Sequence, residues 1–216
     1  MESRGSPWPW TGLLIALAAL LQQAIPHVVG DGPSFLASMW QVGVMAVGMA
    51  SLSLILLPPR RLSFALGFLV CAALMGWALW LQFGEGLEPC PLCQFQRVAV
   101  VLIGLTFLVG TLHEPGRIGA WIYSILLFVF AAAGAALATR QVWLQALPKD
   151  QVPACGMGLS YMLDTLPFID VLRRVLEGSG ECAEKGWVFL GLSIAGWTLA
   201  FFFTIAVAGF ALARRD

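Results

Sequence analysis

The chain has 216 residues, of which 59% are hydrophobic and 11% are charged, and its mean hydropathy is +0.85. Soluble domains carry about 25% charged residues, so this composition is that of a polytopic membrane protein. The formal net charge is zero at pH 7. This excludes the strongly basic surface that a nucleic-acid partner requires.

Six apolar stretches are candidates for membrane-spanning helices, each of which needs roughly 20 apolar residues. The weakest is 11–29, because Gln22, Gln23 and Pro26 interrupt it. This stretch could instead be a signal peptide, since Arg4 precedes a short apolar core. No small-x-small cleavage site follows it, so we interpret it as a retained helix. The other five stretches follow in chain order: 35–57, 64–83, 95–112, 118–139 and 188–213.

The charges between the spans predict their orientation. Basic residues occupy alternate ends of the spans: Arg60, Arg61, Arg117, Arg214 and Arg215. By the positive-inside rule these ends should be cytoplasmic. The opposite ends carry Glu85, Glu88 and the segment 140–185, which holds five of the 12 basic and six of the 12 acidic residues. We therefore expect periplasmic loops at about 84–94 and 140–187.

The second of these loops contains apolar residues at helical spacing, interrupted by Pro167. The apolar positions are Leu159, Met162, Leu163, Leu166, Ile169, Leu172, Val175 and Leu176. Charged side chains occupy the other faces. The pattern predicts a bent amphipathic helix on the outer membrane surface, in contact with lipid. A helix packed on the protein's own outer surface is the alternative.

Five cysteines are present: Cys71, Cys90, Cys93, Cys155 and Cys182. Cys71 falls in the middle of a span, where a thiol packs as a small apolar side chain. The other four fall in or beside the two polar loops and therefore on one face. Four cysteines on an oxidising face predict disulfide chemistry or one metal site.

The sequence Cys90-Pro91-Leu92-Cys93 stands directly before an apolar helix. Pro91 suits a first helical turn, where unpaired N–H groups favour negative charge and so the reactive thiolate. Arg97 lies four residues after Cys93 and shares its helix face. Its charge would stabilise a Cys93 thiolate or a reduced, anionic oxygen of a bound acceptor. Alternatively, Arg97 extends to lipid headgroups.

Two structural explanations compete with redox chemistry. The cysteines could form two inert disulfides, but strained short disulfides are labile rather than structural. They could instead form a four-thiolate zinc site, but the separation between Cys155 and Cys182 is too long for a zinc knuckle. The sequence therefore favours a redox-active pair with no metal.

The order of these features closely resembles the disulfide bond formation protein B (DsbB) family. A span is followed by Pro-Cys-x-x-Cys-x-x-x-Arg at 89–97 and by two further spans. A two-cysteine loop then ends in Ser-Gly-Glu-Cys-Ala-Glu at 179–184, and Trp-Val-Phe-Leu-Gly-Leu at 187–192 leads into the last span. The resemblance covers about 64–215. It implies an all-α membrane protein: a four-helix transmembrane bundle at 61–216, preceded by a hydrophobic extension, 1–60, with one or two additional spans.

The resemblance also implies an enzyme of the bacterial inner membrane, a multi-pass thiol:quinone oxidoreductase. It would reoxidise a periplasmic thioredoxin-fold disulfide donor, similar to DsbA, and pass the electrons to ubiquinone or menaquinone. By the family pattern, the donor's thiol attacks Cys155, Cys182 exchanges with Cys90, and Cys93 is left as a thiolate facing the quinone. Arg97 matches the family's arginine beside the quinone ring.

Two other functions compete with this one. Vitamin K epoxide reductase-like enzymes also combine loop cysteines with a Cys-x-x-Cys at a quinone, but their loop pair precedes that motif, whereas here it follows. A membrane scaffold or metal-binding protein with structural cysteines is the non-enzymatic alternative.

Overall fold

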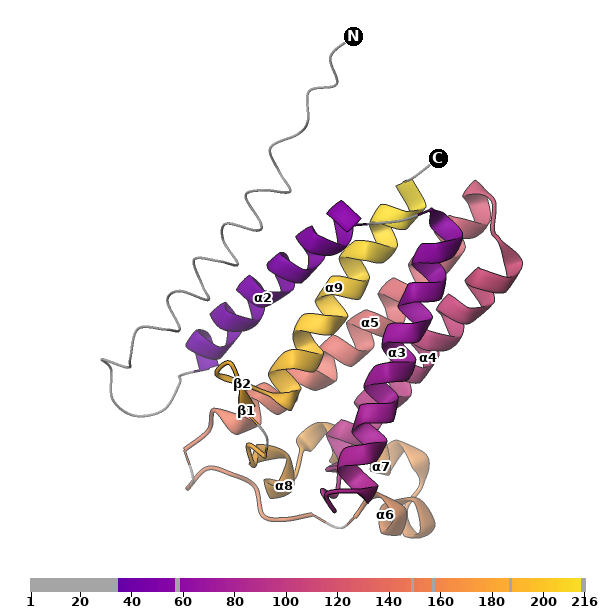
Figure 1. Cartoon of the computed structure of the whole chain (residues 1–216). Coiled ribbons are helices and arrows are strands. Elements are labelled where there is room, and N and C mark those ends of the chain that lie inside the picture. The colour runs from indigo at the N-terminus through magenta and orange to yellow at the C-terminus, as the bar shows by residue number, and fades with distance from the viewer. Residues whose placement is uncertain (1–34, 57–58, 149, 157, 187, 215–216) are drawn as a thin grey trace.

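Within the described part of the chain, four helices are long and apolar enough to cross a membrane: α3 (Arg60–Phe83), α4 (Pro91–His113), α5 (Arg117–Gln145) and α9 (Ile194–Arg214). The computed structural model describes residues 35–56, 59–148, 150–156, 158–186 and 188–214. Figure 1 shows the long helices side by side, with the short helices gathered at one end. We call this the cysteine end, because α4 begins there with Cys90 and Cys93. The expected all-α membrane fold is confirmed.

An additional helix, α2 (Phe35–Leu56), precedes the four and agrees with the span expected at 35–57. Its 22 residues include no charged side chain. It packs along α9 (Figure 1), and its Val42, Met45 and Ala46 join the main apolar core. The other expected N-terminal span, 11–29, lies outside the described residues.

Small residues let the spanning helices approach closely, as is common in membrane bundles. Gly134 of α5 faces the ring of Phe202 of α9, and a Cβ at this glycine would lie 2.4 Å from the ring. Between α3 and α4, Gly110 meets the ring of Phe64 in the same way. Phe64 and Phe202 are therefore completely buried, with exposed fractions of 0%.

The last spanning helix begins at Ile194 and not at Val188, where the expected span started. Two short strands, β1 (Val188–Phe189) and β2 (Leu192–Ser193), form an antiparallel hairpin before it. The turn has positive φ at Leu190 and Gly191, 50° and 78°, which breaks helical geometry. The hairpin residues are themselves mostly apolar, so hydropathy alone did not predict this turn.

The expected amphipathic helix is present as two helices, α6 (Leu159–Thr165) and α7 (Phe168–Glu177), followed by α8 (Gly180–Ala183). Leu166 is extended because it precedes Pro167, which separates α6 from α7. Val171 and Val175 of α7 are buried in a second apolar cluster with Leu92 of α4 and Leu144 of α5. The loop helices therefore pack on the protein itself.

The opposite side of these helices remains apolar. Phe168 and Ile169 are 63% and 79% exposed, and Leu163 and Leu176 are also exposed. Apolar side chains at a bundle end are suited to the boundary between headgroups and acyl chains. The two expectations for this segment are thus compatible, because its two faces differ.

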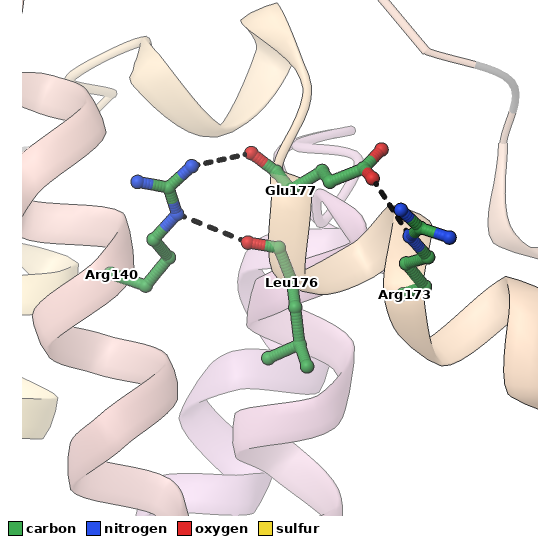
Figure 2. A network of polar contacts seen from close by, with 4 residues as sticks. All are labelled: Arg140, Arg173, Leu176 and Glu177. Carbon is green, nitrogen blue, oxygen red and sulfur yellow. Dashed lines mark hydrogen bonds and ion pairs between the residues drawn. The ribbon is translucent and has the colours of Figure 1, made fainter.

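Arg140 holds α7 against α5 (Figure 2). Its Nε donates to the carbonyl of Leu176 at 3.0 Å, and one terminal nitrogen donates to the carbonyl of Glu177 at 2.8 Å. These are carbonyls at the end of α7, which lack partners within the helix and favour a positive charge. The Glu177 carboxylate turns away to Arg173, at 3.4 Å. Arg140 thereby fixes the chain shortly before Cys182.

Replacing Arg140 should loosen α7. We expect Arg140→Ala to increase amide hydrogen exchange in α7 about tenfold, because two hydrogen bonds are lost at an exposed position where water replaces part of each, a net loss of about 1.4 kcal/mol. Exchange measured by mass spectrometry on the detergent-purified protein checks this. The control is Arg173→Ala, which removes an exposed ion pair of small value. Equal protection in the two variants would contradict the role of Arg140.

Candidate redox site

Cys90 and Cys93 lie at the start of α4. Cys90 is the N-cap residue and has an extended backbone. Pro91 occupies the first helical position, as expected for a proline. Cys93 follows in the first turn, and the two sulfur atoms are 3.1 Å apart. All five cysteines are free thiols. The local helix start therefore places the two thiols of the motif in contact.

Cys182 of α8 reaches the same place from the loop. Its side chain is completely buried in one apolar cluster with Cys90 and Leu92, close enough for the Cys90 thiol to influence its charge. It also accepts hydrogen bonds from the backbone of Ser179 and of Leu92. Leu92 lies in the first turn of α4, where N–H groups have no partner within the helix. The helix start that was expected to stabilise a thiolate thus directs a donor at Cys182.

The surroundings shift the pKa values of the two buried thiols, Cys90 and Cys182, in opposite directions. The pKa of Cys182 is lowered to about 6. The largest cause is the Cys90 thiol, followed by the Ser179 and Leu92 donors, and together these outweigh the burial, which would raise the pKa. The contacts with Cys182 and with Cys93 raise the pKa of Cys90. With a pKa of about 6, Cys182 favours the thiolate near neutral pH, the form that attacks disulfides.

Cys155 lies apart from this cluster and is exposed. Its segment runs beside the one that carries Cys182, because the Gly180 N–H donates to the Ala154 carbonyl at 3.2 Å. A Cβ at Gly180 would lie 2.7 Å from the Pro153 carbonyl oxygen, so this close approach requires glycine. Cys155 and Cys182 line one cavity of about 210 Å³. A reagent from water reaches Cys155 first.

Arg97 lies one helical turn after Cys93 and points toward α3. It donates to the Ala78 carbonyl at 3.0 Å and to Oε1 of Gln82. Its side chain is half-buried. The positive charge is therefore held between α3 and α4 by protein oxygens.

Gln141 is the residue of this site that sequence reasoning missed. α5 continues to Gln145, beyond the expected end at 139, and its added turn places the Gln141 amide nitrogen 3.1 Å from the Cys93 sulfur. Gln96 of α4, also buried, contacts Gln141. Amides within or next to apolar spans were a usable signal, because polar residues inside membrane bundles are commonly functional.

The remaining cysteine belongs to the main core. Cys71 of α3 is buried, and its Cβ lies against Gly104 of α4. Among the described residues, no group of three or more His, Cys, Asp or Glu side chains is arranged to hold a metal ion.

Comparison with known proteins identifies the family. The model of the family "Disulfide bond formation protein DsbB" matches residues 60–212. Disulfide bond formation protein B of Hahella chejuensis is 57% identical over 157 residues, which are 72% of this chain and 95% of that relative. The protein of the same name from Nitrosococcus oceani is 52% identical over 68% of this chain and 87% of its own length. Disulfide bond formation protein B 1 of Pseudomonas aeruginosa is 49% identical over 72% of this chain and 94% of its own length.

The family model's match contains all five cysteines and all but the last two residues of α9, and these comparisons confirm the resemblance that the motifs suggested. The chain is a multi-pass membrane protein of disulfide-bond formation and belongs to the DsbB family.

Proposed function

We propose that this protein is a thiol:quinone oxidoreductase that reoxidises a DsbA-like, thioredoxin-fold partner in the periplasm of a bacterium. The observation that carries the proposal is the contact of Cys182 with Cys90 and of Cys90 with Cys93. Structural disulfides need two separate pairs, whereas three thiols in contact allow sulfur–sulfur bonds to be exchanged. The exposed Cys155 supplies the entrance.

The first step takes place at Cys155. A thiolate of the reduced partner attacks its sulfur in a Cys155–Cys182 disulfide; the partner–Cys155 bond forms, and Cys182 leaves as a thiolate. The exposure of Cys155 and the burial of Cys182 support this order. The partner's second thiol then attacks the mixed disulfide and releases the oxidised partner and the Cys155 thiol.

The second step transfers the electrons to α4. The Cys182 thiolate attacks Cys90 in a Cys90–Cys93 disulfide, so that the Cys182–Cys90 bond forms and Cys93 leaves as a thiolate. The Ser179 and Leu92 donors support Cys182 as the attacking group, because they still favour its thiolate when Cys90 is bonded to Cys93 and has no hydrogen to donate. The contact with Cys90 means that little movement is needed.

The oxidant is a membrane quinone of the ubiquinone or menaquinone class, which takes up two electrons and two protons when bound. Cys155 then attacks Cys182, which re-forms the Cys155–Cys182 bond and releases Cys90. Oxidation of the Cys90–Cys93 dithiol by the quinone would re-form the second disulfide, so that over the cycle one partner dithiol becomes a disulfide and one quinone becomes a quinol. Arg97 fits such an acceptor, because two of its five N–H groups serve protein oxygens and others can donate to a ring oxygen. Neither of the two cavities described is lined by Arg97. The ring would therefore lie on the lipid-facing surface near α3 and α4.

The proposed periplasmic location of the cysteines is supported by the charges at the other end. Arg60 and Arg61 begin α3, Arg117 begins α5, and Arg214 ends α9. These ends lie opposite the cysteine end (Figure 1) and carry the basic excess expected on the cytoplasmic side.

Quinone reduction by the purified protein tests the proposal, with a reduced thioredoxin-fold donor as the electron source. We expect Cys93→Ala to abolish turnover, because the electrons then have no exit. Arg97→Ala should lower kcat/KM for the quinone by tenfold or more, the size of one charge-assisted hydrogen bond. The control, Cys71→Ala, should keep at least half of the activity. Failure of the wild type with both quinone classes, or loss of turnover in folded Cys71→Ala, would overturn the proposal.

The pH dependence of Cys182 tests the attacking group. With a pKa of about 6, its thiolate predominates above that pH, so alkylation by iodoacetamide should rise through pH 6 and level off by about pH 7. Peptide mass spectrometry on the reduced protein reads this site alone. Cys90→Ala removes the largest donor and should move the midpoint upward by at least one pH unit, whereas Cys71→Ala should not. A midpoint above pH 8 in the wild type would contradict the assignment.

A further inference from the structure

A buried chain of polar side chains runs from the thiols of α4 across α5 to α9. The Gln141 amide nitrogen lies 3.1 Å from the Cys93 sulfur and 3.6 Å from the Cys90 sulfur. Gln141 Oε1 accepts from the Gln96 amide nitrogen at 2.7 Å. Gln96 Oε1 in turn accepts from the Thr198 hydroxyl at 2.9 Å. Three helices thus contribute to one hydrogen-bonded chain that ends on sulfur.

The chain sets the orientation of the Gln141 amide. Its oxygen is also 3.5 Å from the Cys93 sulfur, but this oxygen already accepts the short hydrogen bond from Gln96. The nitrogen is the closer atom, so it presents an N–H group to the sulfur. The Thr198 hydroxyl is closest to the oxygen of Gln96, at 2.9 Å, and shares its one hydrogen with the Ile194 and Ala195 carbonyls, each at 3.0 Å. The Gln96 nitrogen is thereby directed at Gln141. Each amide therefore holds the next in one orientation.

Burial increases the importance of this donor. Gln96 and Gln141 are each only 4% exposed. A thiolate formed beside them has little water to solvate it, and an ion in such a place needs directed donors. An N–H group aimed at a charged sulfur forms a charge-assisted hydrogen bond, which is stronger than the same bond to a neutral thiol. Gln141 consequently favours the reduced, anionic form of Cys93 over the disulfide.

We propose that Gln141 is a catalytic residue of this protein: its side-chain N–H stabilises the Cys93 thiolate that is released when Cys182 captures Cys90, and Gln96 and Thr198 are positioning residues that hold the amide. The inference rests on the proposed function for the step in which it acts. In that step the electron pair of the broken Cys90–Cys93 bond stays on Cys93, and Gln141 donates a hydrogen bond without losing its proton.

An equilibrium measurement tests this independently of turnover. The full chain with Cys155→Ala and Cys182→Ala retains the Cys90–Cys93 pair, whose dithiol fraction can be followed in dithiothreitol redox buffers by a gel shift with a large maleimide. We expect Gln141→Leu to shift the equilibrium about tenfold toward the disulfide at pH 7, which corresponds to about 30 mV for two electrons. The difference should shrink as the pH falls, because a neutral thiol gains less from the donor.

A matched control and a conservative variant separate this role from general packing. Ser124→Ala also removes a buried hydrogen bond between α5 and α9, to the Gly209 carbonyl, but far from the thiols. It should leave the equilibrium unchanged. Gln141→His retains an N–H donor and should return the equilibrium to within about threefold of the starting chain. Gln96→Leu, which leaves Gln141 in place but unoriented, should shift the equilibrium in the same direction by a smaller factor.

The outcomes distinguish the two proposals. An unchanged equilibrium in folded Gln141→Leu, or an equal shift in Ser124→Ala, would overturn the role of Gln141 even if the wild type reduces quinone. If Gln141→Leu does not fold, an unchanged equilibrium in Gln96→Leu would overturn it instead. A tenfold shift in a protein that reduces no quinone would support the Gln141 contact and reject the proposed function.

Discussion

The first turn of α4 is the feature on which the site depends. A helix start leaves N–H groups without partners, and here one of them, at Leu92, is used by the Cys182 sulfur. Cys90 is the N-cap of the same helix, and its thiol is the largest influence that lowers the pKa of Cys182. Because the helix fixes the positions of these groups, the sulfur of Cys182 has one favourable position. The meeting of two distant cysteines is thus a consequence of helix geometry.

Apolar packing and one arginine keep the loop in that place. Cys90 and Cys182 are themselves members of the cluster formed by Met162, Val175 and Leu144, so the sulfur atoms lie in an environment with little water. Arg140 adds a fixed point at the end of α7. Cys155 is outside this cluster and exposed. The two loop cysteines therefore have different surroundings, as the proposed exchange requires.

The last turns of α5 connect these parts. Arg140 contacts α7, Gln141 contacts the thiols of α4, and Gln145 contacts Ser193 of β2 at 2.6 Å and the Glu184 carbonyl at 3.3 Å. Three neighbouring polar side chains thus bind three different elements at the cysteine end. The helix can extend beyond its apolar span because its polar face is buried against protein. The additional helix α2 also reaches this end, where Gln41 lies near Gly191 of the hairpin turn.

The sequence by itself determined the membrane class, the four spanning helices, the broken amphipathic segment and the four candidate cysteines. These features follow from local rules: apolar length, proline positions and cysteine spacing. Tertiary structure decided that Cys182 contacts Cys90, that Arg140 holds α7, that Gln141 reaches Cys93 and that a hairpin precedes α9. Such contacts join residues far apart in the chain, and periodicity carries no information on which of them meet. The direction of an amide or a thiol depends on partners from several helices, so only the assembled bundle defines it.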